Sequence, residues 1–135
     1  AGLGNVRFLD GQPRQEIPNL IRASDVCLVM LKKNAVFETV VPTKMLEFMA
    51  CGRPVILCVN GQARSLLESA KGGLYVEPEN ATGLAEAIVH LKQDASLREA
   101  LGMNGRRYVV ENMTRAAKAG QYVDVLNTIA GGRRR

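Results

Sequence analysis

The sequence predicts an α/β fold, a doubly wound parallel Rossmann-like sheet with a helical C-terminus. Short apolar runs alternate with stretches of helical periodicity, which is typical of strand–helix–strand units. Two runs, residues 25–31 and 55–59, are almost entirely apolar, as expected of strands buried on both faces. The length of 135 residues, 47% of them hydrophobic and 23% charged, fits one globular domain with its own core.

The first half of the chain is expected to alternate strands and helices. Strands are predicted over residues 6–9, 25–31, 55–59 and 74–76. A short helix is expected from about residue 16, and residues 32–41 are expected to form a polar loop. Pro42-Thr43 opens a helix that runs to Cys51, with Gly52 as its stop, and another helix spans residues 62–70. Because about five or six strands are usual in such sheets, we expect that the first strands are missing upstream.

The remainder of the chain reads as three helices. Asn80 is expected to cap the first, a capping box at Ser96-x-x-Glu99 to start the second, and Thr114 to cap the third, which Gly131-Gly132 ends. The third helix carries apolar side chains at helical spacing, namely Ala119, Tyr122, Val123, Leu126 and Ile129. We therefore expect one partial domain over residues 1–130 and a disordered basic tail over residues 131–135.

Composition excludes several classes of protein. Residues 1–102 carry no net charge, whereas residues 103–135 carry +5, which is weak evidence for nucleic-acid binding. Cys27, Cys51 and Cys58 form no C-x-x-C motif and lie in or beside apolar runs, which indicates buried thiols in a reducing compartment. There is no metal-ligand spacing, signal peptide or apolar run that could span a bilayer. A cytoplasmic location is expected, and the full-length protein could also associate with the inner face of a membrane.

Three loops are the candidates for a ligand site. In open α/β sheets, ligands bind at the carboxyl ends of the strands. In this sequence that rule selects residues 10–14, 32–43 and 60–64.

The helix that opens at Pro42 begins in one of these loops. Its first N–H groups, at Thr43 and Lys44, have no partners within the helix, so with the helix dipole they form an anion site. Glu47 shares a helix face with both residues. A diphosphate at the helix N-terminus and a carboxylate that accepts hydrogen bonds from ribose hydroxyls suit a nucleotide. Alternatively, Lys44 and Glu47 form an ordinary i,i+3 surface pair, and spacing alone does not decide between these interpretations.

Residues 42–56 carry a resemblance to a known family. The pattern Pro-Thr-Lys-x-x-Glu-Phe-Met-Ala-x-Gly-x-Pro-Val-Ile closely resembles the donor-site helix of family-four retaining glycosyltransferases of the GT-B fold, and most of all their bacterial cell-surface polysaccharide branch. Further segments that resemble this family lie at residues 5–11, 20–26, 73–78 and 102–106. The resemblance implies the C-terminal, donor-binding Rossmann-like domain of such an enzyme, which lacks its first strands here.

The resemblance also implies roles for individual residues. It implies that Glu47 binds the ribose hydroxyls. It also implies that the N–H groups of Thr43 and Lys44, which follow Pro42, bind the diphosphate. Main-chain groups of the loop at Gly11, Gln12 and Arg14 are implied to contact the nucleobase.

One residue departs from the family pattern. Many members carry two glutamates eight positions apart, the first near the donor sugar. Here the position eight before Glu47 is Thr39, which becomes the candidate. The neighbouring Glu38 is expected to point elsewhere in an extended segment. The sugar-facing group and the catalytic residue therefore stay unassigned.

These observations favour an enzyme whose full-length form transfers a sugar, hexosyltransferase-like, from a nucleotide-diphosphate sugar to a glycan or lipid-linked acceptor. No cofactor besides that donor and no metal is expected. The acceptor domain is expected upstream, so the chain alone is expected to be inactive and, with an unpaired strand edge, to self-associate. The alternative is a non-catalytic nucleotide-binding or interaction module of the same fold. A sugar-nucleotide epimerase is disfavoured because the expected carboxylate and His groups are not found.

Overall fold

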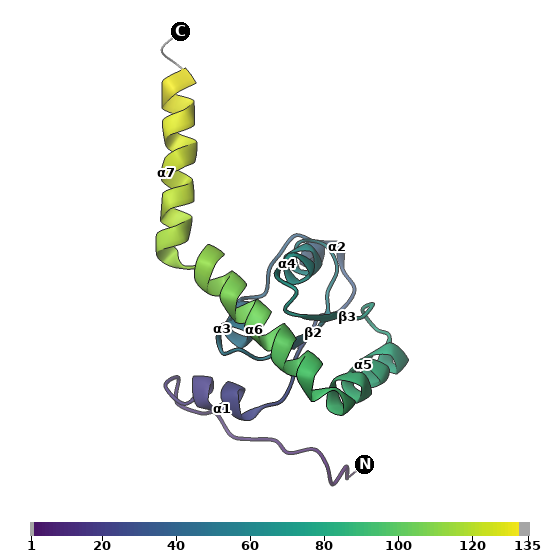
Figure 1. The fold of residues 1–135 in the computed structure, drawn as a ribbon. Coiled ribbons are helices and arrows are strands. Elements are labelled where there is room, and N and C mark those ends of the chain that lie inside the picture. Colours follow the sequence, from purple (N-terminus) through teal and green to yellow (C-terminus); the bar gives the residue numbers. More distant parts are fainter. Residues whose placement is uncertain (1, 133–135) are drawn as a thin grey trace.

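The computed structural model describes residues 2–132 as a three-stranded parallel sheet surrounded by helices (Figure 1). The elements in chain order are α1 (Ile17–Ala23), β1 (Cys27–Met30), α2 (Ala35–Glu38), α3 (Thr43–Ala50), β2 (Val55–Cys58), α4 (Gln62–Ala70), β3 (Gly73–Tyr75), α5 (Ala81–Gln93), α6 (Ala95–Asn112) and α7 (Arg115–Gly132). The strands follow the order β1-β2-β3, with Cys27 opposite Val55 and Val55 opposite Gly73. The predicted parallel α/β fold with a helical C-terminus is confirmed.

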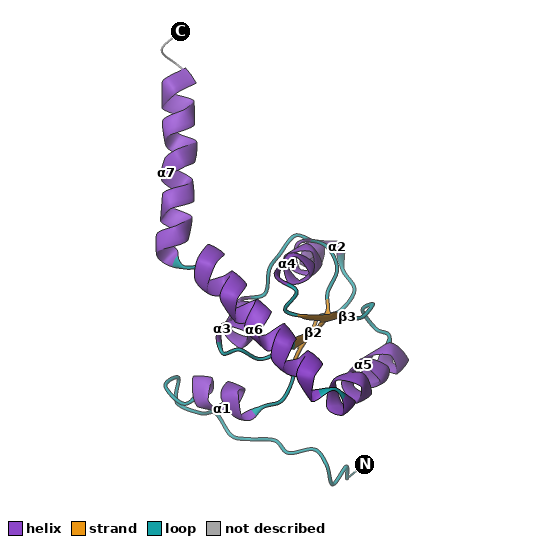
Figure 2. Ribbon diagram, in the orientation of Figure 1, coloured by secondary structure: helices purple, strands orange, loops and turns teal. Residues whose placement is uncertain are grey.

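The central strand β2 separates two halves of the core. All four of its residues are buried, and successive side chains point to opposite faces. Val55 and Leu57 pack with residues of α3 and α4, whereas Ile56 and Cys58 pack with residues of α5 and α6. Figure 2 shows the short strands enclosed by helices. The sheet is therefore doubly wound, as the apolar runs predict.

Helix α6 connects the two halves. Its Leu101 belongs to the cluster around Ile56, while Tyr108 and Val109 pack against the cluster around α3. It approaches the turn before β2 so closely that a Cβ atom on Gly102 would lie 2.3 Å from the Gly52 carbonyl oxygen. Only glycine permits that approach. Its N-cap is Asp94, whose side chain accepts a hydrogen bond from the Leu97 N–H at 2.8 Å, so the prediction of a Ser96–Glu99 capping box is wrong.

The prediction of a strand over residues 6–9 is also wrong. The segment forms no ladder with β1 and runs as an extended chain beside α1 (Figure 1). The side chain of Phe8 is 95% exposed. A β-branched and aromatic run fits a strand only where a neighbouring strand and a core receive it, and neither is present here. Within the described residues the sheet therefore has three strands instead of four, and β1 is an edge strand.

The prediction that residues 32–41 form a loop is partly wrong, because they contain α2. The side chain of Asn34 caps this short helix and accepts a hydrogen bond from the Val36 N–H at 2.9 Å. The caps predicted at Asn80 and Thr114 are confirmed, with bonds from the Gly83 and Ala117 N–H groups.

Helix α7 extends away from the rest of the molecule (Figure 1). The apolar side chains predicted at helical spacing are present on it but exposed, with Tyr122 at 65%. The helix continues through Gly132, so Gly131 does not end it, and the remaining tail residues, 133–135, lie outside the described part of the chain. In residues 2–132, no helix combines the length and apolar character needed to cross a membrane.

Candidate functional site at the carboxyl edge of the sheet

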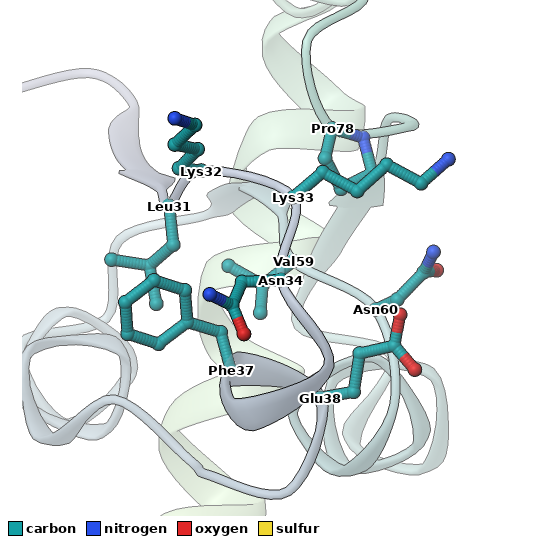
Figure 3. Close-up of a pocket in the computed structure, with 9 residues that line it drawn as sticks. All are labelled: Leu31, Lys32, Lys33, Asn34, Phe37, Glu38, Val59, Asn60 and Pro78. Carbon is teal, nitrogen blue, oxygen red and sulfur yellow. The ribbon is translucent and has the colours of Figure 1, made fainter.

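The carboxyl ends of the three strands open onto one edge of the molecule. Because the strands are parallel, the loops that follow them meet there. The close-up in Figure 3 shows a small pocket at this edge, lined by Leu31, Lys32, Lys33, Asn34, Phe37, Glu38, Val59, Asn60 and Pro78. Leu31, Phe37 and Val59 supply apolar walls, and the remaining side chains supply both signs of charge and amide groups. The edge thus places apolar walls beside charged and amide side chains.

Helix α3 begins at the same edge because it runs back from the β1 end toward the start of β2. Met45 and Met49 are completely buried and fix the helix on the sheet. No side chain caps its N-terminus, and the first helical bond runs from the Met45 N–H to the Pro42 carbonyl at 2.9 Å. The N–H groups of Thr43 and Lys44 therefore have no partner within the helix, as predicted.

The Lys44 and Glu47 side chains are exposed and do not pair with each other. The ion pairs within residues 2–132 are Lys33–Glu77 and Arg64–Glu68, and neither Lys44 nor Glu47 takes part in a side-chain hydrogen bond there. The simple explanation of this motif as an i,i+3 surface pair is therefore not supported. Both charges remain available to a ligand.

Because of helix α2, Glu38 lines the pocket and the neighbouring Thr39 does not. The Thr39 hydroxyl donates a hydrogen bond to the Val36 carbonyl at 2.8 Å and closes the end of α2. Successive residues of a helix are rotated by about 100°, so the alternation of an extended chain does not apply. The segment is helical and not extended, so the reason for expecting Glu38 to point elsewhere does not hold.

Gly61, in the loop after β2, lets that loop approach Glu38 closely. Its φ is +73, and a Cβ atom there would lie 2.0 Å from the Glu38 carbonyl oxygen. A residue with a side chain fits neither the conformation nor the space. The sequence shows Asn60-Gly61 as a turn, but nothing in it reveals the contact with α2.

A polar network adjoins the pocket on the β3 side. The Tyr75 hydroxyl lies 2.6 Å from Glu77 Oε2 and 2.5 Å from Asn60 Oδ1, and Glu77 Oε1 pairs with the Lys33 ammonium at 3.4 Å. The Arg64 guanidinium lies 4.0 Å from the centre of the Tyr75 ring. Burial, together with the bond to Glu77 and its charge, raises the pKa of Tyr75 to about 12. Bonds from Tyr75 and Lys33 hold the pKa of Glu77 below its ordinary value, although partial burial opposes them. Tyr75 therefore stays neutral and donates its proton to a charged Glu77. Sequence reasoning missed this network.

The loop at Gly11, Gln12 and Arg14 is not brought to this pocket. All three residues are exposed, and the Gln12 amide bonds only to the nearby Asp10 carbonyl at 3.0 Å. Figure 1 shows α1, which follows this loop, on the opposite side of the sheet from α2. Across residues 2–132, no group of three or more His, Cys, Asp or Glu side chains could hold a metal ion.

An uncapped helix N-terminus at the carboxyl edge of a parallel sheet is the arrangement of α/β domains that bind anionic ligands. Residues 1–108 match the family model described as glycosyl transferases group 1. The chain belongs to this family, and its sheet and helices match the C-terminal domains of GT-B glycosyltransferases.

Individual relatives agree with this assignment. The D-inositol 3-phosphate glycosyltransferase of Corynebacterium jeikeium is 34% identical over 97 residues, which are 72% of this chain and 22% of that protein. The structure of a sucrose-phosphate synthase from Thermosynechococcus elongatus has a TM-score of 0.72 at 26% identity, covering 96% of this chain and 31% of that one. The C-terminal domain of a glycosyl transferase group 1 family protein from Francisella tularensis has a TM-score of 0.64 at 25% identity, covering 82% and 53%. The chain thus spans about a fifth to a half of the proteins it matches.

Proposed function

We propose that the full-length protein is a retaining glycosyltransferase, and that this part of it binds a nucleotide-diphosphate sugar at the carboxyl edge of the sheet. The observation that carries the proposal is the N-terminus of α3, where two N–H groups lack helical partners and the Lys44 and Glu47 side chains are unpaired. Membership of the glycosyl transferase group 1 family supports the same function.

Helix α3 takes the diphosphate and the ribose in this proposal. The N–H groups of Thr43 and Lys44 donate hydrogen bonds to phosphate oxygens, and the Lys44 ammonium adds a positive charge. Glu47 lies one turn further along the same face and accepts hydrogen bonds from the two ribose hydroxyls. Since the carboxylate is exposed and unpaired, it needs no other contact to be broken first.

Glu38 is the carboxylate that we place toward the donor sugar. It lines the pocket beside Lys32 and Lys33, whereas the Thr39 hydroxyl is already bonded to the end of α2. A carboxylate accepts hydrogen bonds from sugar hydroxyls in the same way as from ribose. Gly61 packs closely against the Glu38 backbone carbonyl, which limits the space into which α2 could move.

The proposed chemistry depends on the leaving group. Transfer of the sugar breaks its bond to the diphosphate and leaves negative charge on the phosphate oxygens. The hydroxyl of a glycan or lipid-linked acceptor forms the new bond to the sugar on the face that the diphosphate leaves, as retention requires, and its proton passes to the released phosphate oxygen. The α3 N-terminus and Lys44 would stabilise the charge that develops there and hold the donor in place. The donor sugar nucleotide is itself the substrate, and no separate cofactor is part of this proposal.

Titration calorimetry of the full-length protein tests the proposal. A series of nucleosides, nucleoside monophosphates, nucleoside diphosphates and their sugar conjugates is compared. Affinity that increases sharply with the diphosphate supports a donor site. Binding of no nucleotide at all would contradict it and would favour a non-catalytic module of the same fold.

A further inference from the structure

Lys33 is bonded twice to the loop that follows β3. Its backbone N–H donates a hydrogen bond to Glu79 Oε1 at 3.3 Å, and its ammonium lies 3.4 Å from Glu77 Oε1. We call these two contacts the Lys33 bridge. Because β2 separates β1 from β3, the bridge connects the loops of two strands that are not neighbours in the sheet.

The backbone of Glu79 is in an unusual conformation. The Asn80 N–H bonds to the Glu77 carbonyl at 3.2 Å and closes a turn, with Pro78 in its second position and Glu79 in its third. The φ of Glu79 is +66. A positive φ at the third position of such a turn usually selects glycine or asparagine. A glutamate there carries a backbone cost that the rest of the structure must offset, and its carboxylate contacts Lys33.

The bridge acts on a segment that lines the pocket. Lys33 is followed directly by Asn34, the N-cap of α2, and α2 carries Phe37 and Glu38 into the pocket. At the far end of α2, the loop after β2 comes so close to the Glu38 carbonyl that residue 61 has no room for a side chain. Residues 32–38 are therefore bonded to the loop after β3 and closely packed against the loop after β2.

We propose that Glu77 and Glu79 are positioning residues that act through Lys33 and set the affinity of the pocket for the sugar-nucleotide donor. This inference rests on the proposed function. The Lys33 and Glu77 side chains are 58% and 47% exposed. Exposed pairs contribute little to global stability. Losing the bridge should consequently change the position of residues 32–38 and donor binding, while the fold remains intact.

The test compares two substitutions at Glu79 in the full-length protein. Glu79→Ala keeps the Cβ atom, and with it the backbone strain, but removes the acceptor. Glu79→Gln keeps an acceptor oxygen for the Lys33 N–H. We expect Glu79→Ala to raise the donor KM about 3- to 10-fold with unchanged kcat and melting temperature, and Glu79→Gln to stay near the parent. Glu86→Gln, an exposed glutamate of α5, is the matched control.

Glu77→Gln extends the test to the ion pair. It removes the charge opposite Lys33, so the donor KM should rise by a similar factor. The substitution keeps an acceptor for the Tyr75 hydroxyl, so that contact is retained. The inference is overturned if Glu79→Ala and Glu79→Gln behave alike, or if KM changes only together with kcat and the melting temperature.

Hydrogen exchange separates the inference from the proposed function. In Glu79→Ala the Lys33 amide loses its acceptor, so it should exchange faster than in the parent without ligand, and the amides of α2 should follow. Unchanged exchange overturns the inference whatever the donor does. If the parent binds no sugar nucleotide although exchange responds, it is the proposed function that fails. If Glu47→Gln weakens donor binding and Glu79→Ala does not, the function stands and the positioning role is wrong.

Discussion

Gly61 packs directly against Glu38, so that a Cβ atom on residue 61 would lie 2.0 Å from the Glu38 carbonyl oxygen. The left-handed φ of +73 adds a second reason for glycine at this position. The contact brings the loop after β2 against the end of α2, at a residue that lines the pocket.

Gly61→Ala should therefore lower the free energy of unfolding by about 1–3 kcal/mol, because strain is added and α2 must move. Donor affinity should fall as well, since α2 carries Glu38. Gly4→Ala is the control, because a Cβ atom there meets nothing within 4 Å; its effect should stay within about 0.5 kcal/mol. Denaturant unfolding measures the stability of both variants. Equal stability of the two variants would show that α2 does not depend on Gly61.

Tyr75→Phe should remove a distinct pH dependence of stability. The pKa of Tyr75 is about 12 in the folded protein, whereas the pKa of a tyrosine in the unfolded chain is about 10. Because the folded pKa is raised, the contribution is present below pH 10 and is lost as the pH rises toward 12. The parent should lose stability in this range more steeply than Tyr75→Phe.

Tyrosinate absorbance provides the direct measurement. The difference between the titrations of the parent and Tyr75→Phe should have its midpoint near pH 12. Tyr122→Phe on α7, whose side chain is exposed, is the control variant. A midpoint for Tyr75 near the ordinary tyrosine value would mean that its hydroxyl is not bonded to Glu77 in solution.

Cys51 should be the first of the three cysteines to react with a thiol reagent. Burial raises the pKa of the Cys27 and Cys58 thiols, with the neighbouring Cys51 adding to the effect at Cys27. Cys51 is only half-buried, at the end of α3. Since the thiolate is the nucleophile, the buried thiols should react slowly. Cys51→Ser should abolish the fast phase and Cys58→Ala should retain it; a fast phase that survives Cys51→Ser contradicts this order.

The sequence predicts best the elements whose signals are local. Helix α3 begins and ends within a residue of its prediction because Pro42 and Gly52 flank an apolar repeat that needs no distant partner. Residues 6–9 have equally strong local features, but a strand exists only where another strand pairs with it. The apolar spacing of α7 likewise predicts a helix correctly, without revealing that its side chains are exposed.

The candidate site divides in the same way. The uncapped N-terminus of α3 depends on neighbouring residues, so it can be predicted from the motif alone. The Lys33 bridge and the Gly61 contact join loops that are distant in the sequence, and Lys33 and Glu77 are separated by 44 positions. Such contacts follow from strand order and register, which short motifs do not contain. Helix α2 was missed because four residues give too short a periodic pattern.

The ribose assignment makes Glu47 the most informative position for substitution. Glu47→Ala removes a charged acceptor for two hydroxyls, which should cost on the order of 2–4 kcal/mol, or roughly 30- to 1000-fold in donor affinity. Glu47→Gln keeps the size of the side chain and should still weaken donor binding on the order of 10-fold, because one acceptor and the charge are lost. Folding should barely change, since Glu47 is exposed and unpaired.

Two further variants in the full-length protein show whether a loss of affinity reflects ribose binding. Lys44→Ala should weaken diphosphates more than nucleosides, because only the diphosphate meets its charge, whereas Glu47→Gln should weaken both, because both contain ribose. Glu111→Gln, which changes an exposed carboxylate of α6, should leave both affinities at the parent values. If Glu47→Gln binds donor as tightly as the parent, or weakens only the diphosphate, then Glu47 does not hold the ribose and the carboxylate on this face of α3 has another partner.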